Sequence, residues 1–97
     1  MSIARTAIQL DPRDSVATAL VDLSAGASVT LDAATVTLAA AIPRGHKFAL
    51  RPISKDEAVM KYGQPIGRAT KPIQPGEHVH VHNVATQRGT REGGVGR

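Results

Sequence analysis

The hydrophobic positions of this chain fall into short runs in which apolar and polar residues alternate, and a period of two predicts β-strands. Glycine, proline or charged residues separate these runs at intervals of roughly ten residues, a spacing typical of compact all-β domains. We expect strands over residues 4–10, 28–31, 35–40, 46–53, 58–62, 66–70 and 78–84.

The segment 11–26 has a different pattern. It opens with Asp11 and Pro12, which suit the N-cap and the first position of a helix, and a second acidic residue, Asp14, follows the cap by three positions. The next apolar residues recur at spacings of four and three, as on one helical face: Val16, Leu20 and Leu23. Gly26 provides a stop. The predicted fold class is therefore mainly β, with one short N-terminal helix.

Two turns of the chain resemble each other. Residues 42–46 and 73–78 both contain an isoleucine, a Pro/Gly turn and a histidine that opens a strand. We interpret them as two similar turns within one domain and not as a repeat array, because no further feature recurs between them.

The composition predicts a small core that benefits from a partner. Aromatic residues make up 2% of the 97 residues, namely Phe48 and Tyr62, so the core is built from Val, Ile, Leu and Ala. A domain of this size buries a modest share of its surface, and we expect a partner subunit or self-association to stabilise it. We assign one domain to residues 1–84 and a flexible Gly/Arg-rich tail to residues 85–97.

Several functional classes are excluded or disfavoured. The chain contains no cysteine, so it has no disulfide, no thiolate metal site and no cysteine nucleophile. No apolar run is long enough for a signal peptide or a membrane span, and we expect a cytoplasmic protein. The formal net charge is +4, but with two aromatics and no basic stripe nucleic-acid binding is poorly supported. A mild excess of cations suits a small anionic ligand.

Three of the four histidines alternate with two valines over residues 78–82. In a strand, this pattern places the histidines on one face and Val79 and Val81 in the core. Alternate Cβ atoms lie about 7 Å apart, which is loose for a single metal ion unless another ligand joins. His46 opens another strand and could approach the same surface. The cluster could hold a metal or transfer protons, or it could be a solvated polar face.

A second cluster consists of Lys61, Tyr62 and Gly63, followed by Gly67. The glycines allow the backbone to approach a ligand closely, and Lys61 with Lys47 could bind a carboxylate. The alternative is a solvated lysine beside an ordinary hairpin turn. The sequence contains no complete catalytic set, such as a nucleophile elbow or a phosphate loop.

These motifs resemble the SAF domain of altronate dehydratase-type proteins. The similarity spans about residues 6–84. It rests on residues 45–47 (Gly-His-Lys), on residues 61–63 (Lys-Tyr-Gly) with residues 66–67, and on Gly76 followed by residues 79–83 (Val-His-Val-His-Asn). His78 lies outside this pattern and is a weaker candidate than His80 or His82.

The resemblance implies a β-clip fold and a divalent-metal-dependent elimination, with Fe²⁺ or Mn²⁺ as cofactor. The implied substrates are hydroxylated sugar acids such as altronate or galactarate, and a similar sulfolactate sulfo-lyase subunit eliminates sulfite instead of water. It further implies a large dehydratase subunit as partner, without which the chain would be inactive. The implied catalytic residues are His46, His80 and His82, the implied metal ligands are His80 and His82, and the implied substrate-binding residues are Lys47, Lys61, Tyr62, Gly63 and Asn83.

A second hypothesis comes from another class of protein. SAF-like β-clip domains also occur as non-catalytic modules, for example in sialic-acid synthases, flagellar assembly chaperones and antifreeze proteins. In that case the chain would only bind a ligand or a partner. The lysine-tyrosine-glycine and histidine-asparagine motifs favour the dehydratase, because an ordinary β-clip requires neither.

Overall fold

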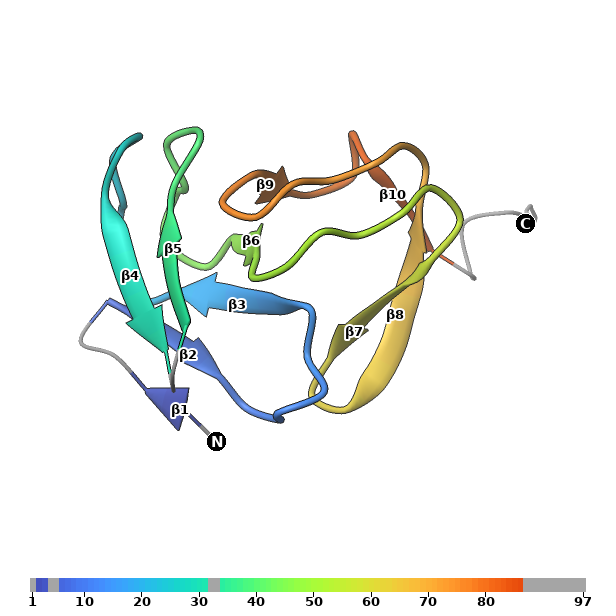
Figure 1. The fold of residues 1–97 in the computed structure, drawn as a ribbon, viewed down its shortest axis with the longest axis horizontal. Helices are drawn as coiled ribbons and strands as arrows, with labels where there is room; N and C mark the ends of the chain where they lie inside the picture. Colours follow the sequence, from blue (N-terminus) through green and yellow to red (C-terminus); the bar gives the residue numbers. More distant parts are fainter. Residues whose placement is uncertain (1, 4–5, 32–33, 87–97) are drawn as a thin grey trace.

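The computed structural model describes residues 2–3, 6–31 and 34–86, and these residues form ten short β-strands and no helix (Figure 1). The strands are β1 (Ser2–Ile3), β2 (Ala7–Gln9), β3 (Val16–Ala19), β4 (Ser28–Leu31), β5 (Ala34–Thr37), β6 (Lys47–Ala49), β7 (Ala58–Lys61), β8 (Gln64–Ala69), β9 (His78–Val79) and β10 (Val84–Ala85). Among these residues there is accordingly no helix that is long and apolar enough to cross a membrane.

A central sheet in the order β1-β2-β3-β6-β9 separates two hydrophobic clusters. The β4–β5 hairpin lies at one side of this sheet, and the three-stranded sheet β10-β8-β7 lies at the other side (Figure 1). Successive residues of β6 point to opposite sides: Phe48 packs in the cluster with β4 and β5, and Ala49 in the cluster with β7 and β8. The central strands β3 and β6 are therefore buried on both faces.

The prediction of a mainly β fold is confirmed, but the N-terminal helix is wrong. Residues 16–19 form β3, which pairs with both β2 and β6. Leu20 and Val21 are exposed, so the apolar spacing did not mark one buried helical face. Asp11 does accept a bond from the N–H of Arg13, at 2.8 Å, as a capping residue would. It closes a turn, because the following residues gain more from pairing on both strand edges than from a helix.

The two similar turns belong to a set of four. In each turn a buried apolar residue is followed, three positions later, by a residue with positive φ: Leu23 and Gly26, Ile42 and Gly45, Ile53 and Asp56, Ile73 and Gly76. The N–H of each positive-φ residue donates to a carbonyl at the end of a neighbouring strand or directly after it, at 2.8 Å in all four cases. Bridges join Leu23 to Ile42 and Ile53 to Ile73.

The recurrence was therefore wider than the sequence interpretation allowed. The first turn contains no proline, and Asp56 occupies the glycine position of the third turn. Aspartate tolerates the left-handed conformation better than most residues, so the turn persists without its usual sequence.

Part of the predicted organisation lies outside the described residues. Residues 4–5 of the first predicted strand and residues 32–33, between the second and third predicted strands, fall there. Of the predicted tail, the structure describes Ala85, which belongs to β10, and Thr86.

Gly45 and Gly76 have nearly the same backbone conformation but different surroundings, so the cost of left-handed backbone strain can be separated from the cost of a steric clash. Gly45 (φ 84°) has nothing within 4 Å of an added Cβ, whereas a Cβ on Gly76 (φ 87°) would overlap the carbonyl oxygen of Thr37. We expect Gly45→Ala to lower the free energy of unfolding by about 1 kcal/mol, the cost of a left-handed alanine. Gly76→Ala should cost about 3 kcal/mol or more, because the clash adds to that strain. Urea denaturation of both variants measures the difference, and equal costs would contradict the packing around Gly76.

Candidate functional site

The histidine-rich segment is a short strand followed by a turn. β9 ends at Val79, and the N–H of Asn83 donates to the carbonyl of His80 at 3.1 Å. The Asn83 side chain completes this turn: its Oδ1 accepts from the N–H of His80 and its Nδ2 donates to the carbonyl of His78, both at 2.9 Å. Asn83 is buried, so its amide shapes the main chain that carries two histidines.

The turn also changes the expected positions of the two valines. Val79 is fully buried and packs beside Ala49 and Val59, as its place in β9 requires. Val81 is 79% exposed, and the expectation that it lies in the core is wrong. The alternation of buried and outward-facing side chains continues one residue beyond β9, to His80, and is lost in the turn that follows.

The pairing of β6 with β9 gathers three histidines from two segments of the chain. Lys47 lies opposite Val79 and Phe48 opposite His78, so the same antiparallel register places His46 opposite His80. Residues two apart in a strand share a face, and His78 and His80 therefore point to the same side as His46. We call His46, His78 and His80 the histidine triad.

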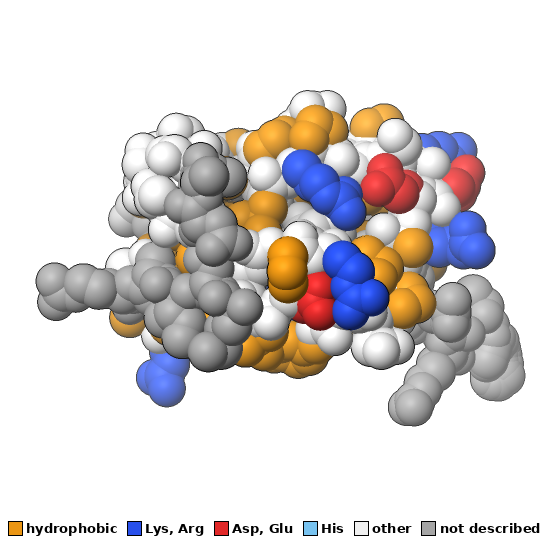
Figure 2. Space-filling model, turned by 60° about the horizontal axis from the view of Figure 1, so that its bottom comes forward, with side chains coloured by type: hydrophobic (Ala, Val, Ile, Leu, Met, Phe, Trp, Pro, Cys, Tyr) orange, Lys and Arg blue, Asp and Glu red, His pale blue; other side chains and the backbone are white. Residues whose placement is uncertain are grey.

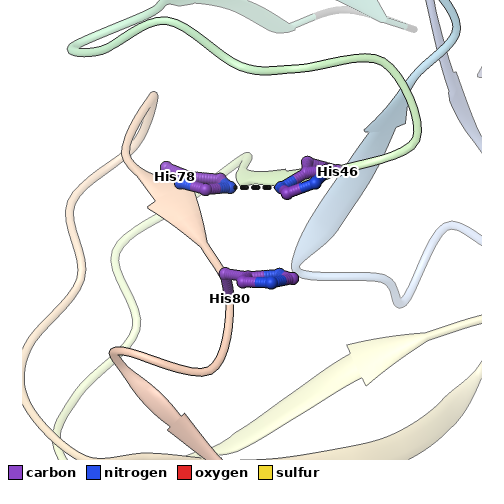
Figure 3. A group of neighbouring side chains, drawn as sticks. All are labelled: His46, His78 and His80. Carbon is purple, nitrogen blue, oxygen red and sulfur yellow. Dashed lines mark hydrogen bonds between the residues drawn. The ribbon is translucent and has the colours of Figure 1, made fainter.

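The rings of the histidine triad lie in direct contact (Figure 3). Nδ1 of His46 is 2.8 Å from Nε2 of His78, a hydrogen bond in which one nitrogen donates and the other accepts. The rings of His46 and His80 stack with their centroids 4.5 Å apart. One ring nitrogen of each residue lies within 4.8 Å of the others. The geometry thus gives His78, ranked low from the sequence, a central place.

His82 lies at the margin of this cluster. Its ring is tilted against that of His78, with the centroids 5.4 Å apart, and it does not belong to the group whose nitrogens converge. The structure therefore brings together His46 and His80 from the predicted catalytic set and places His82 beside them.

Positive charge and partial burial favour neutral imidazoles in the cluster. The pKa of His78 is lowered by burial and then by the charges of His46, His82, His80 and Lys47. The pKa of His80 is lowered by desolvation and then by His46, Lys47 and His82. Near neutral pH these rings have a free nitrogen lone pair, which can accept a proton or bind a metal ion.

His80 belongs both to the histidine triad and, with Lys47, to the lining of a pocket of about 120 Å³. Burial and then the positive charge of Lys61 lower the pKa of Lys47. The pocket has one ammonium and one imidazole among mostly apolar neighbours, a combination that suits a small anion with a hydrocarbon part. Its lining residues are Lys47, Ile66, His80, Val81, Val84 and Thr86.

The lysine-tyrosine-glycine motif forms the tight turn between β7 and β8. Tyr62 and Gly63 both have positive φ, 58° and 71°, as a two-residue hairpin loop requires. Lys61 Nζ lies 4.6 Å from the centre of the Tyr62 ring, and Tyr62 is 52% exposed. Lys61 and Tyr62 thus remain available to a ligand or a partner.

Gly63 has a structural contact instead. It is buried, and its N–H donates to Oδ1 of Asp14 at 2.8 Å. An added Cβ would lie 2.6 Å from the Asp11 carboxylate, so this position has no room for a side chain. The Ser15 hydroxyl accepts from the N–H of Met60 at 2.9 Å and anchors the same hairpin. The segment 11–15 therefore ties the hairpin to the central sheet.

Other parts of the surface lack this concentration of imidazoles. On the face shown in Figure 2, hydrophobic and oppositely charged side chains are interspersed, and no histidine of the described residues is visible. The gathering of the four histidines beside a pocket that Lys47 and His80 line is consequently a local feature of the described residues. The chain is thus a small β domain with a surface chemically suited to a small anion or a metal ion.

The comparison with known families makes this class specific. Residues 5–87 match the altronate/galactarate dehydratase SAF domain family. The chain belongs to this family, which confirms the resemblance seen in its motifs.

Relatives of two kinds share this domain. Altronate dehydratase of Escherichia coli is 51% identical over 79 residues, which cover 81% of this chain and 16% of that protein. The alpha subunit of (2R)-sulfolactate sulfo-lyase is 58% identical over 48 residues in Chromohalobacter salexigens, covering 50% of this chain and 51% of that subunit. The same subunit in Paracoccus pantotrophus is 42% identical over 53 residues, which cover 55% of this chain and 79% of that subunit. The chain thus spans a small part of the dehydratases and half or more of the sulfo-lyase subunits.

The lowered pKa values of His78 and His80 predict a stability that depends on pH. A histidine whose pKa is lower in the folded state than the ordinary value of about 6.5 makes its full contribution above that value, and the contribution is lost as pH falls through the folded pKa. We expect the melting temperature of the chain, measured with a chelator present, to fall between about pH 7 and pH 5. The double variant His78→Gln, His80→Gln should flatten this fall. If the melting temperature of the variant fell as steeply with pH as that of the wild type, groups other than these two histidines would cause the fall.

Proposed function

We propose that this chain forms one wall of the active site of a lyase that eliminates water from a hydroxylated sugar acid, such as altronate or galactarate, or sulfite from sulfolactate. The observation that carries the proposal is the pocket where Lys47 and His80 meet, in a chain of this family. A carboxylate of the substrate binds to the ammonium group of Lys47, and the apolar lining from Ile66 and Val84 contacts its carbon chain.

The chemistry requires a base and an acid. The base removes the proton from the carbon next to the carboxylate, and the electron pair forms a double bond as the hydroxyl on the neighbouring carbon leaves. The acid protonates this hydroxyl, which departs as water, so atoms and charge balance. Because the metal would take up the lone pairs of His46 and His80, the neighbouring His82 is the histidine suited to accept the proton. Lys61 and Tyr62 assist in binding the substrate.

A divalent metal, expected as Fe²⁺ or Mn²⁺, would stabilise the negative charge that develops on the carboxylate when it is bound. The converging nitrogens of the histidine triad fit such an ion, because imidazole is a common ligand of Fe²⁺ and related metals. Lys47 supplies positive charge near the same surface, and Lys61 is close enough for its charge to lower the pKa of Lys47.

We propose a large dehydratase subunit as the partner that completes the site. The name of the sulfo-lyase relatives, subunit alpha, supports this arrangement, although self-association is the alternative. Val81 and Tyr62 are large apolar residues exposed near the pocket or on the hairpin of Lys61, and burial against a partner would remove them from water. This contact would close the pocket over the substrate.

A second candidate, a non-catalytic binding module, is favoured by one observation. Gly63 and Asn83, two residues of the family motifs, are engaged in the fold, so part of the motif has a structural explanation. The side chains of Lys47, Lys61 and the histidines hold no main-chain segment in place among the contacts described, and the lyase explains them better.

Reconstitution with a large dehydratase subunit tests the proposal. We expect the isolated chain to show no turnover of altronate, galactarate or sulfolactate with Fe²⁺ or Mn²⁺, and the mixture to turn over one of them. Lys47→Met should lower kcat/KM by about 10- to 100-fold, because the variant loses one charge-assisted hydrogen bond to the substrate carboxylate. Lys55→Met, at an exposed lysine of the third turn, is the matched control and should leave the rate unchanged.

Two results would contradict this account. Turnover by the isolated chain would remove the need for a partner. A mixture that binds the acids without turning them over would favour the binding module.

A further inference from the structure

We propose that the histidine triad, His46, His78 and His80, binds one transition-metal ion on this chain alone, without a partner subunit or a substrate. This differs from the pair His80 and His82 that the family resemblance implied. It is also independent of the proposed lyase activity, because it rests on the geometry of one β-strand pair.

The nitrogen positions are close to those of a metal site. In a tetrahedral site each imidazole nitrogen lies about 2.0–2.1 Å from the ion, and two such nitrogens are about 3.3 Å apart. The triad's nitrogens already lie within 4.8 Å of one another, and those of His46 and His78 are 2.8 Å apart. Small rotations of the side chains would therefore bring all three to the ion. On binding, the ring that donates this hydrogen bond would carry its proton on its other nitrogen, so that both facing nitrogens have a lone pair for the ion.

The backbone that carries the triad is held in place. Gly45 and Gly76 precede the two strands, and their N–H groups donate to Ala19 and Ala49, each at 2.8 Å. Asn83 fixes the main chain of both His78 and His80. Sites built on such fixed elements keep their geometry better than sites on loops.

The ligand set also indicates the class of metal. Three imidazoles without a carboxylate suit borderline ions such as Zn²⁺, Co²⁺ or Fe²⁺ and not Mg²⁺ or Ca²⁺, which prefer oxygen. Three protein ligands leave a fourth position for water or another oxygen ligand. The His82 ring lies outside the converging group, so we assign it no bond to the ion.

The experiment titrates the metal-free chain with Zn²⁺ by calorimetry and with Co²⁺ by visible absorption spectroscopy. We expect one ion per chain, the intense visible bands of four-coordinate Co²⁺, and a melting temperature that rises with excess Zn²⁺. His46→Gln and His78→Gln should each weaken Zn²⁺ binding by about tenfold or more, since each removes one ligand. His82→Gln is the matched control, and its affinity should stay within about threefold of the wild type.

Circular dichroism of each variant shows whether it remains folded, so that lost binding can be assigned to the ligand itself. The absence of Zn²⁺ binding by the folded chain would overturn the proposal. It would equally be overturned if His82→Gln abolished binding while His78→Gln retained it. No substrate or partner is present in these titrations, so their failure is distinct from a failure of the lyase proposal.

Discussion

The antiparallel pairing of β6 with β9 is the interaction on which the site depends. Lys47 lies opposite Val79 and Phe48 opposite His78, and the same register places His46 opposite His80. A shift of this register by one residue would turn the imidazoles to the opposite face of the sheet and expose Val79. Because Val79 and Phe48 are fully buried in the two clusters, the core itself fixes the register, and stability and site geometry have one cause.

The four similar turns maintain this register in a chain with few aromatic residues. Each turn inserts one leucine or isoleucine into the core and hydrogen-bonds a positive-φ residue to a neighbouring strand. The turns at Gly45 and Gly76 flank β6 and β9, so backbone conformation places the triad. The buried side chains of Asp14 and Ser15 hold the β7–β8 hairpin, with Lys61 and Tyr62 at its tip, against the same sheet. Lys47 and the histidines thus gather from segments distant in sequence, and Lys61 lies close enough for its charge to lower the pKa of Lys47.

The sequence predicted local features well and long-range ones poorly. The strand at residues 28–31 and the hairpin around Gly63 were found because alternation and turn residues act locally. The helix at residues 11–26 was wrong, since pairing of β3 with two neighbours outweighed a helical spacing. The turn after β9 depends on the buried amide of Asn83, and the role of His78 depends on a contact with His46, 32 residues away. No local pattern contains that information.

The central claim is that the pairing of β6 with β9 gathers His46, His78 and His80, and NMR spectroscopy of the metal-free chain tests it most directly. The account predicts nuclear Overhauser contacts from the ring protons of His46 to those of both His78 and His80, together with main-chain contacts between Phe48 and His78. Ring contacts of His80 with His82 alone, and none with His46, would contradict it.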